Sequence, residues 1–285
     1  MIRTFWIIML AIFTMLMHGC LNFKKNDKRV ARQIEKEGNL YTVAYDSVNS
    51  KSVRYLHYQH VDPSAPLLLF IHGAPGSSSA LSDFMKDEGL RSDYAMMVID
   101  RPGYGETDYG NYTPIIEQAK TIISFIEKNR KSDQKVYIAG HSYGGTIAGY
   151  LAILNPSWLE GVVMIAPAID PDHEKYFWFG KLGLYKSTRW MASKALQVAS
   201  LEKYNHEEEL SAFKDRWKEI QTPILHIHGD HDKVVPFENL SFSKANIPES
   251  YLYTEIMEGD NHFIPFKKTD ELAEMISSFI QSIRK

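Results

Sequence analysis

Short apolar runs alternate along this chain with stretches that fit an amphipathic helix, and this alternation restricts the fold more than any other feature. The runs are four or five residues long and lie at 67–71, 95–99, 136–139, 162–166 and 224–227, with a further candidate at 251–257. The stretches that favour helices lie at 78–90, 114–129, 142–154, 238–245 and 270–283. Continuous apolar runs are typical of strands buried on both faces, so the pattern predicts an α/β fold with a mostly parallel, doubly wound sheet.

Two earlier runs, 40–45 and 53–58, alternate between apolar and polar residues instead. Such alternation is typical of strands with one buried face, and the residues between them, 46–50, favour a turn. We therefore expect an N-terminal antiparallel hairpin at the entrance to the sheet.

Residues 170–220 interrupt the alternation, because they fit helices and carry no strand pattern. We predict that this segment is a helical cap, inserted between a first part of the core at 39–169 and a second part at 221–285. The aromatic residues of the segment are Tyr176, Phe177, Trp178, Phe179, Tyr185, Trp190, Phe213 and Trp217. They could line a substrate pocket, dock on lipid beside the lysines and arginine among them, or pack the cap onto the core.

The N-terminal end carries an export pattern. Arg3 precedes an apolar stretch, 5–17, which is shorter than the roughly 18 residues of a membrane span and fits a signal peptide. Cys20 follows Gly19, and residues 16–20 resemble a bacterial lipobox, apart from Met17 and His18. The resemblance implies a signal peptide over 1–19, a lipidated Cys20, a polar tether over 20–38 and a place on the membrane of the bacterial cell envelope. A plain signal peptide, or an uncleaved anchor with an incidental cysteine, is the alternative.

Charge and cysteine content narrow the classes of protein further. The formal net charge is −3, from 32 Lys and Arg against 35 Asp and Glu. No basic excess is available to neutralise phosphates, so nucleic acid is not an expected partner. Cys20 is the single cysteine, so an exported domain must gain its stability from its buried core and not from disulfides.

Gly140-His141-Ser142-Tyr143-Gly144 lies between the predicted strand 136–139 and the predicted helix 142–154. A Gly-x-Ser-x-Gly match is weak alone, and its position between strand and helix strengthens it. A sharp turn there forces strained backbone angles on Ser142, and the flanking glycines remove side chains that would collide. The hydroxyl then projects at a helix N-terminus, where free N–H groups favour developing negative charge.

Four further motifs surround this turn in the sequence. They are His72-Gly73-Ala74-Pro75-Gly76, Asp100-Arg101-Pro102-Gly103-Tyr104-Gly105, Gly229-Asp230-His231-Asp232 and Gly259-Asp260-Asn261-His262-Phe263. With the serine turn they occur in the order found in α/β hydrolases, so the chain resembles that superfamily from about residue 40 to its C-terminus. Because the residue at the turn is serine and not aspartate, the haloalkane dehalogenase and epoxide hydrolase branches fit poorly.

The resemblance implies a role for each motif. Ser142 is the nucleophile, His262 the base and Asp232 the acid that orients it, with the backbone N–H groups of Ala74 and Tyr143 as oxyanion donors. Asp230 competes as the acid. Asp232 is favoured because the family spacing from Gly229 lands on it and Val234-Val235-Pro236 follows. His72 and His141 are expected to have structural roles.

The same resemblance implies a cofactor-free hydrolysis through an acyl-enzyme. Carboxylic-ester cleavage, as in a carboxylesterase or lipase, is the leading prediction, with a small-molecule or lipid ester as substrate. A prolyl aminopeptidase-like activity is second, because residues 72–76 are close to the His-Gly-Gly-Pro-Gly of those enzymes while the serine turn lacks their form. Hydrolysis of a C–C bond uses the same three residues.

Two hypotheses that assign the chain to another class of protein remain. His226-Ile227-His228-Gly229-Asp230-His231 matches the His-x-His-x-Asp-His pattern of metallo-β-lactamase-type zinc hydrolases,. That fold takes further ligands well downstream, whereas here His262 is the only later histidine, so no metal is expected. A non-catalytic binding protein on the same fold is the other reading, although all three triad residues are present.

Overall fold

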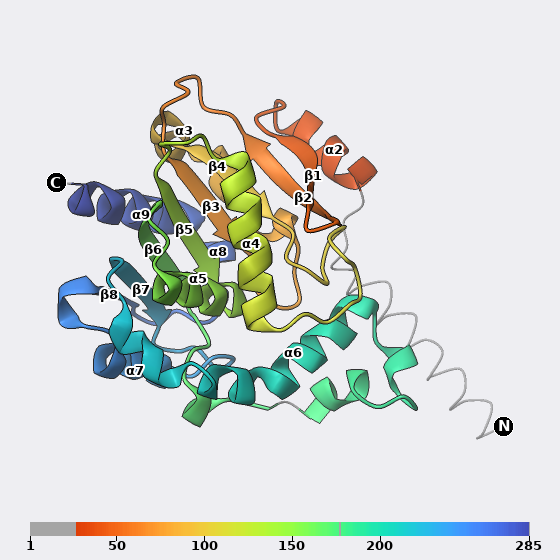
Figure 1. Ribbon diagram of the computed structural model, residues 1–285. Coiled ribbons are helices and arrows are strands. Elements are labelled where there is room, and N and C mark those ends of the chain that lie inside the picture. The colour runs from red at the N-terminus through yellow and green to blue at the C-terminus, as the bar shows by residue number, and fades with distance from the viewer. Residues whose placement is uncertain (1–26, 177, 285) are drawn as a thin grey trace.

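The computed structural model describes residues 27–176 and 178–284, and its centre is an eight-stranded sheet (Figure 1). The strand order is β1-β2-β4-β3-β5-β6-β7-β8. The strands are β1 (Thr42–Val48), β2 (Lys51–Tyr58), β3 (Leu67–Ile71), β4 (Ala95–Ile99), β5 (Val136–His141), β6 (Leu159–Ile165), β7 (Ile224–Gly229) and β8 (Leu252–Met257). From β4 to β8 every neighbouring pair is parallel, while β1, β2 and β4 pair antiparallel. The predicted α/β fold with its N-terminal hairpin is confirmed.

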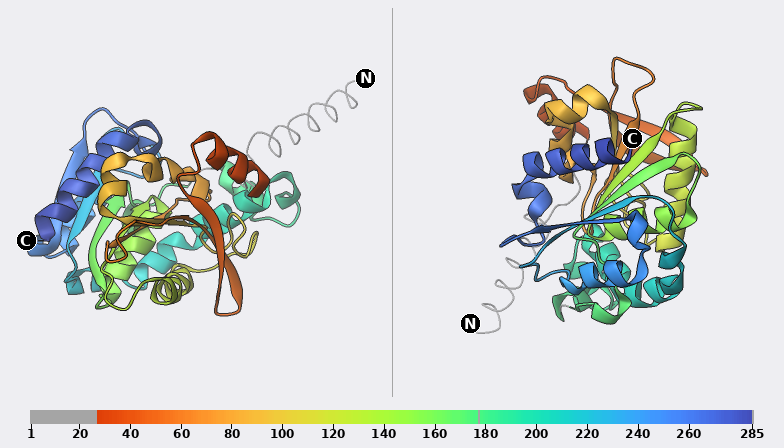
Figure 2. Two further views of the ribbon diagram at one scale, coloured as in Figure 1. Left: turned by 90° about the horizontal axis from the view of Figure 1, so that it is seen from above. Right: turned by 90° about the vertical axis from the view of Figure 1, so that its left-hand side faces the viewer.

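Helices cover both faces of the sheet (Figure 2). One face carries α4 (Ile115–Asn129), α5 (Tyr143–Leu154) and α7 (Glu238–Asn246), whose buried residues form one core cluster with the sheet. The other face carries α2 (Asp27–Lys36), α3 (Glu88–Asp93), α8 (Ile264–Lys267) and α9 (Thr269–Ile283), which form a second cluster. Every residue of β3, β5 and β7 is buried. Burial on both faces explains why these strands are continuous apolar runs in the sequence.

Two predicted boundaries differ from the structure. The stretch 78–90 is not one helix but η1 (Ser78–Ala80), η2 (Ser82–Lys86) and α3. The side chain of Asp87 accepts a hydrogen bond from the Leu90 N–H, with 2.8 Å between nitrogen and oxygen, and this cap starts α3 as a separate helix,. The hairpin turn is shorter than 46–50. Asn49 and Ser50 alone form it, both with positive φ, as a two-residue hairpin turn requires,.

Residues 170–220, predicted as a helical cap, connect β6 to β7 through helices, and their described part contains no strand. The helices are η3 (Pro171–His173), η4 (Trp178–Gly183), η5 (Arg189–Met191), α6 (Lys194–Ser211) and η6 (Lys214–Glu219), with η7 (Glu249–Tyr251) later in the chain. The α6 helix contacts residues that directly follow β4 and β5, so it covers the carboxyl ends of these strands.

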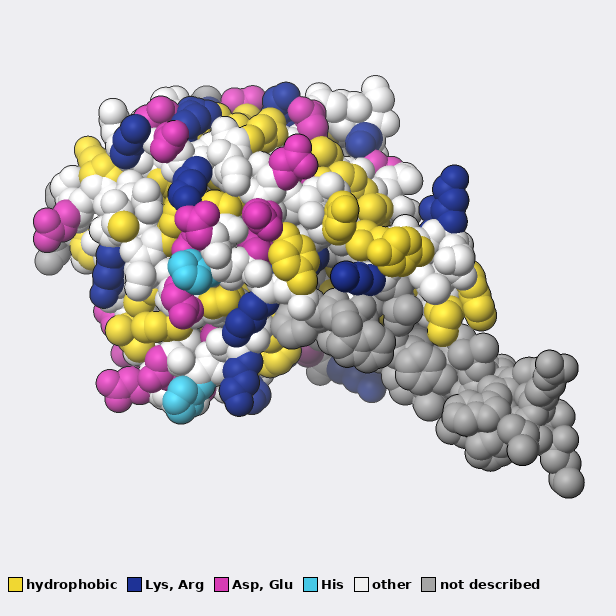
Figure 3. Space-filling view, turned by 90° about the horizontal axis from the view of Figure 1, so that it is seen from below, with side chains coloured by type: hydrophobic (Ala, Val, Ile, Leu, Met, Phe, Trp, Pro, Cys, Tyr) yellow, Lys and Arg dark blue, Asp and Glu magenta, His cyan; other side chains and the backbone are white. Residues whose placement is uncertain are grey.

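Four aromatic residues of the cap with described side chains fall into two groups. Phe213 and Trp217 are buried, where Phe213 lies against Tyr150 of α5 and Trp217 lies against Gly149. Tyr185 and Trp190 are each 58% exposed. Figure 3 shows the cap side of the molecule, where hydrophobic side chains are exposed beside lysines and arginines. Packing onto the core therefore explains only part of the aromatic content.

The segment predicted as a tether, 20–38, is folded over its described part, so that prediction is wrong from residue 27 onward. There α2 buries Val30 and Ile34 against the second core cluster. Asp27 pairs with Arg54, 3.1 Å apart, which fixes the start of the helix. These two apolar residues, at positions i and i+4 of a mostly polar helix, are enough to attach α2 to the core. Two residues are too few to be recognised in the sequence as a periodic apolar pattern.

The predicted signal peptide and Cys20 lie outside the described residues. Across 27–176 and 178–284, no helix is both long and apolar enough to cross a membrane.

Replacing Ile34 by alanine tests whether α2 belongs to the folded domain. We expect Ile34→Ala to lower the free energy of unfolding by about 2 kcal/mol or more, because the side chain is buried against the core,. The exposed Arg32 of the same helix supplies the control, since Arg32→Ala should change that free energy by less than about 0.5 kcal/mol. Urea unfolding of the two variants measures both values. Equal unfolding midpoints would show that α2 is a tether after all.

Candidate active site

Ser142 occupies a strained turn between β5 and α5. Its backbone angles are φ 55° and ψ −123°, a combination that costs energy for any residue with a side chain. The glycines make this turn sterically accessible, because a Cβ on Gly144 would lie 2.2 Å from the carbonyl oxygen of Ile71, and one on Gly140 equally close to that of Gly144. The predicted turn is thus formed, packed directly on the end of β3.

The loop of residues 72–76 lies against the serine. A Cβ on Gly73 would lie 3.1 Å from the Cβ of Ser142, so no side chain separates the two backbones. Among the described residues, the N–H groups of Ala74 and Tyr143 have no hydrogen-bond acceptor. The Tyr143 N–H also lies at the start of α5, where the helix dipole favours negative charge,. Both predicted oxyanion donors are therefore free to bind an anion.

His262 and Asp232 are brought together by the loops after β8 and β7. The Nδ1–H of His262 donates to Oδ2 of Asp232, with 2.7 Å between the two atoms. The N–H groups of Val234 and Val235 both donate to Oδ1 of the same carboxylate at 2.8 Å. Burial raises the pKa of Asp232, but hydrogen bonds from His228 and His262 outweigh it and hold that pKa below its usual value,. The carboxylate is therefore charged and firmly oriented.

Asp230, the competing acid, has a different role. Its side chain is exposed, and Oδ1 accepts a hydrogen bond from the Gly259 N–H at 2.7 Å. It braces the loop that carries His262 but makes no contact with the imidazole. Of the two aspartates, the structure places only Asp232 against His262.

The two histidines expected to be structural are both buried. His141 Nε2 donates to the carbonyl oxygen of His262 at 3.0 Å, and burial, together with the nearby His262, lowers the pKa of His141 to about 3. His72 accepts the Arg101 N–H at Nε2, 3.1 Å away, and donates from Nδ1 to the Gly73 carbonyl oxygen at 2.7 Å. Burial, then Arg101, lowers its pKa as well. Both rings are neutral and hold the loops around Ser142.

Comparison with known proteins identifies the family. The sequence model of the alpha/beta hydrolase family matches residues 68–275, well over half of the chain. This chain belongs to the alpha/beta hydrolase family. The uncharacterized hydrolase YugF of Bacillus subtilis (strain 168) is 25% identical over 271 residues, covering 82% of this chain and 96% of YugF. The proline iminopeptidase PfmaB of Pestalotiopsis fici is 23% identical over 262 residues, covering 76% of this chain and 92% of that protein.

Two solved structures share the whole architecture. A membrane phospholipase A, described as a bacterial virulence factor, has a TM-score of 0.69 and 18% identity, with full coverage of both chains. A putative lipase of Acinetobacter baumannii AYE has a TM-score of 0.69 and 19% identity, over 93% of this chain and 99% of the lipase. At these identities the likeness shows the fold, and the family match identifies this α/β hydrolase as an enzyme.

The zinc-like pattern in the hydrolase has another explanation in the structure. His226 and His228 are buried on β7 and hydrogen-bonded to each other, Nε2 to Nδ1 at 3.0 Å. His226 Nδ1 also bonds to Ser243 Oγ at 2.8 Å, so both of its ring nitrogens are used. His231 is exposed. Over the residues that the structure describes, no group of three His, Cys, Asp or Glu side chains is arranged to hold a metal ion.

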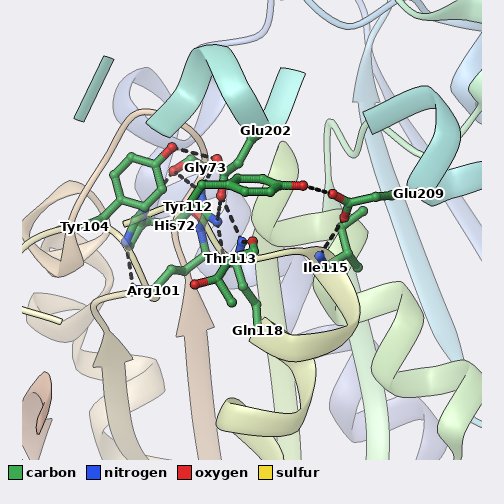
Figure 4. Close-up of polar contacts among 10 residues, drawn as sticks. All are labelled: His72, Gly73, Arg101, Tyr104, Tyr112, Thr113, Ile115, Gln118, Glu202 and Glu209. Atoms are coloured by element: carbon green, nitrogen blue, oxygen red, sulfur yellow. Dashed lines mark hydrogen bonds and ion pairs between the residues drawn. The ribbon is translucent and has the colours of Figure 1, made fainter. Parts of the chain in front are cut away.

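Two contributors to the hydrolase site were missed in the sequence. His228 lies behind the acid, with Nε2 3.5 Å from Oδ2 of Asp232. Glu202 of α6 is buried against Arg101, which follows β4 (Figure 4). No local pattern could have revealed the contact of Glu202 with Arg101, which lie 101 positions apart. The His228 contact requires the chain to turn back at the end of β7.

Proposed function

We propose that this hydrolase cleaves carboxylic esters through an acyl-enzyme on Ser142, with His262 as the base and Asp232 as the orienting acid. The buried 2.7 Å hydrogen bond between His262 and Asp232 is the observation that carries the proposal. The strained backbone at Ser142 and the two free N–H groups at Ala74 and Tyr143 support it.

Each group has a defined part in the reaction. Because Asp232 accepts the Nδ1–H of His262, the other ring nitrogen, Nε2, is left to take the proton from the Ser142 hydroxyl. The hydroxyl oxygen then attacks the ester carbonyl, and the N–H groups of Ala74 and Tyr143 bind the resulting oxyanion. His262 returns the proton to the departing alcohol. Water, activated by the same histidine, hydrolyses the acyl-enzyme and restores Ser142.

A prolyl aminopeptidase-like activity is the second candidate, since a relative named proline iminopeptidase aligns over most of both chains. Esters rank first because both solved structures reported above are named as a phospholipase or a lipase. The exposed Tyr185 and Trp190 of the cap are compatible with a lipid ester,.

Substitutions of the three residues test the mechanism. We expect Ser142→Ala to abolish labelling by a fluorophosphonate probe and to lower kcat for p-nitrophenyl butyrate by about 10³-fold or more. Asp232→Asn should lower kcat by about 10²- to 10⁴-fold, because the imidazole loses its oriented tautomer. Asp230→Asn is the matched control, with a change of less than about threefold, since Asp230 does not contact His262,. Folded wild-type protein that resists the probe would support the binding-protein alternative.

A substrate panel tests the ranking of reactions. We expect p-nitrophenyl esters of rising chain length to be hydrolysed with kcat/KM at least about tenfold above that of a prolyl amide. The physical reason is that p-nitrophenolate leaves more readily than an amine, so an amide needs the additional binding energy of a dedicated site. Purified wild type measures the panel, and Ser142→Ala gives the background. A reversed order would make the peptidase activity the primary one.

We also propose that the chain is exported and anchored in the bacterial cell envelope through a lipid on Cys20, as the lipobox-like residues suggest,. Expressed in a bacterium with an alkyne fatty acid, the wild-type protein should take up the label and fractionate with membranes. Cys20→Ser should lose the label, whereas Ser142→Ala should keep it. Label retained in Cys20→Ser would contradict the anchor.

A further inference from the structure

Arg101 lies buried behind the loop that carries the Ala74 N–H (Figure 4). Its Nε donates to the His72 carbonyl oxygen at 2.8 Å, and one terminal nitrogen donates to the Gly73 carbonyl oxygen at 3.1 Å. The remaining N–H groups bind Gln118 and Glu202. All five donors of the guanidinium are therefore used, and two of them hold the backbone of this loop.

The contact with Gly73 determines more than the position of one oxygen. The Gly73 carbonyl and the Ala74 N–H belong to the same peptide group, which is planar and trans, so its C=O and N–H point in opposite directions,. A donor that fixes the carbonyl therefore also fixes the direction of the N–H. His72 Nδ1 donates to the same oxygen at 2.7 Å. The proposed oxyanion donor is thus oriented from behind by two hydrogen bonds, one of them from a cation.

The charge on Arg101 adds to this effect. Burial lowers the pKa of Arg101, but the adjacent Glu202 carboxylate outweighs it, so its pKa is raised. A cation bound to a carbonyl oxygen polarises the peptide group and makes its N–H a stronger donor. In the water-excluded interior such polarisation is weakly screened.

Glu202 is what keeps this cation in place. Its Oε1 accepts from Arg101 and Gln118, both at 2.8 Å, and its Oε2 accepts from Arg101 at 3.3 Å and from the Tyr104 hydroxyl at 2.6 Å. The carboxylate thus accepts four hydrogen bonds in a site that is 1% exposed. Glu202 belongs to α6 of the cap, so the cap supplies the counter-charge for a group that orients the core.

We propose that Glu202 and Arg101 are a positioning pair that sets the direction and strength of the Ala74 N–H and so couples the cap to oxyanion binding. The inference rests on the proposed function, because it assigns Ala74 as an oxyanion donor. Neither residue touches the reacting atoms. Both act through the peptide group between Gly73 and Ala74.

The same helix offers a matched control. Glu209 lies two turns after Glu202 on α6 and also anchors the cap, since it accepts hydrogen bonds from the Tyr112 hydroxyl and, at 2.6 Å, from the Ile115 N–H (Figure 4). It makes no contact with residues 72–76. Glu202→Gln and Glu209→Gln therefore remove the same charge from the same helix, and only the first disturbs the loop.

The test compares three measurements on the full chain. In Glu202→Gln we expect kcat for p-nitrophenyl butyrate to fall about 10- to 100-fold, with KM within about threefold, because the donor acts on the transition state. The inhibition constant of an alkyl boronic acid, whose anionic tetrahedral adduct with serine mimics the oxyanion intermediate, should rise by a similar factor. Hydrogen–deuterium exchange of residues 72–81 should accelerate by about tenfold or more. In Glu209→Gln all three should stay within about threefold of wild type, even if the melting temperature falls.

A second variant tests the proposal even if Glu202→Gln does not fold, which can happen because Glu202→Gln leaves a buried cation without its partner. The double variant Arg101→Met with Glu202→Leu buries no charge, and it should fold while still losing kcat and boronate affinity. Equal losses in Glu202→Gln and Glu209→Gln, or unchanged exchange of residues 72–81 in Glu202→Gln, would overturn the positioning pair. If the wild type neither reacts with the fluorophosphonate probe nor cleaves esters, the proposed function fails, and the exchange measurement still decides the positioning.

Discussion

One steric constraint underlies the site: a backbone carbonyl of β3 occupies the space where a side chain at position 144 would be. The distance to a Cβ there would be 2.2 Å, which no ordinary residue tolerates. This close approach allows the end of β3, the turn at Ser142 and the start of α5 to meet without side chains between them. Because Gly73 follows two residues after β3, the same contact brings its backbone against the serine. Short backbone distances therefore bring the backbone at Gly73 close to Ser142,.

Buried polar groups around this point are either neutral or fully paired. Burial, as the first cause, lowers the pKa of His72, His141 and His226, so each is an uncharged hydrogen-bonding group. Arg101 and Glu202 form two hydrogen bonds with each other, and both also bind neighbouring groups. Unlike His72, His141 and His226, His262 has its Nδ1 on a buried carboxylate. In the proposed mechanism, a proton taken from Ser142 would be stabilised at His262 and not shared with these neutral rings.

Local rules explain which features could be predicted from the sequence. The buried strands were evident because burial on both faces requires a continuous apolar run, and the turn at Ser142 was evident because only glycine fits at 140 and 144,. The choice of Asp232 over Asp230 followed from the family resemblance, and the structure places only Asp232 on the imidazole.

The features that could not be predicted depend on distant partners. Two apolar residues attach α2 through contacts with strands that come later in the chain. Asp87 divides a stretch that propensity treats as one helix. In the sequence, Glu202 cannot be distinguished from a surface glutamate of a charged helix, and only the fold brings it to Arg101. Local sequence patterns predict which residues are buried and where turns form. Hydrogen bonds and ion pairs between residues far apart in the chain are specified only by the tertiary structure.

The two carboxylates of α6 also restrict how the cap can move relative to the core. Glu202 and Glu209 are two turns apart on one face of the helix and bind two different core elements, Arg101 after β4 and the first turn of α4. Sliding or rotating α6 would separate both pairs at once and leave Arg101 as an uncompensated buried charge, which is far more costly than breaking an exposed ion pair. The α6 helix is therefore held in one position over the carboxyl ends of the strands. Tyr185 and Trp190, which precede α6 in the cap, are each 58% exposed and take no part in these two pairings.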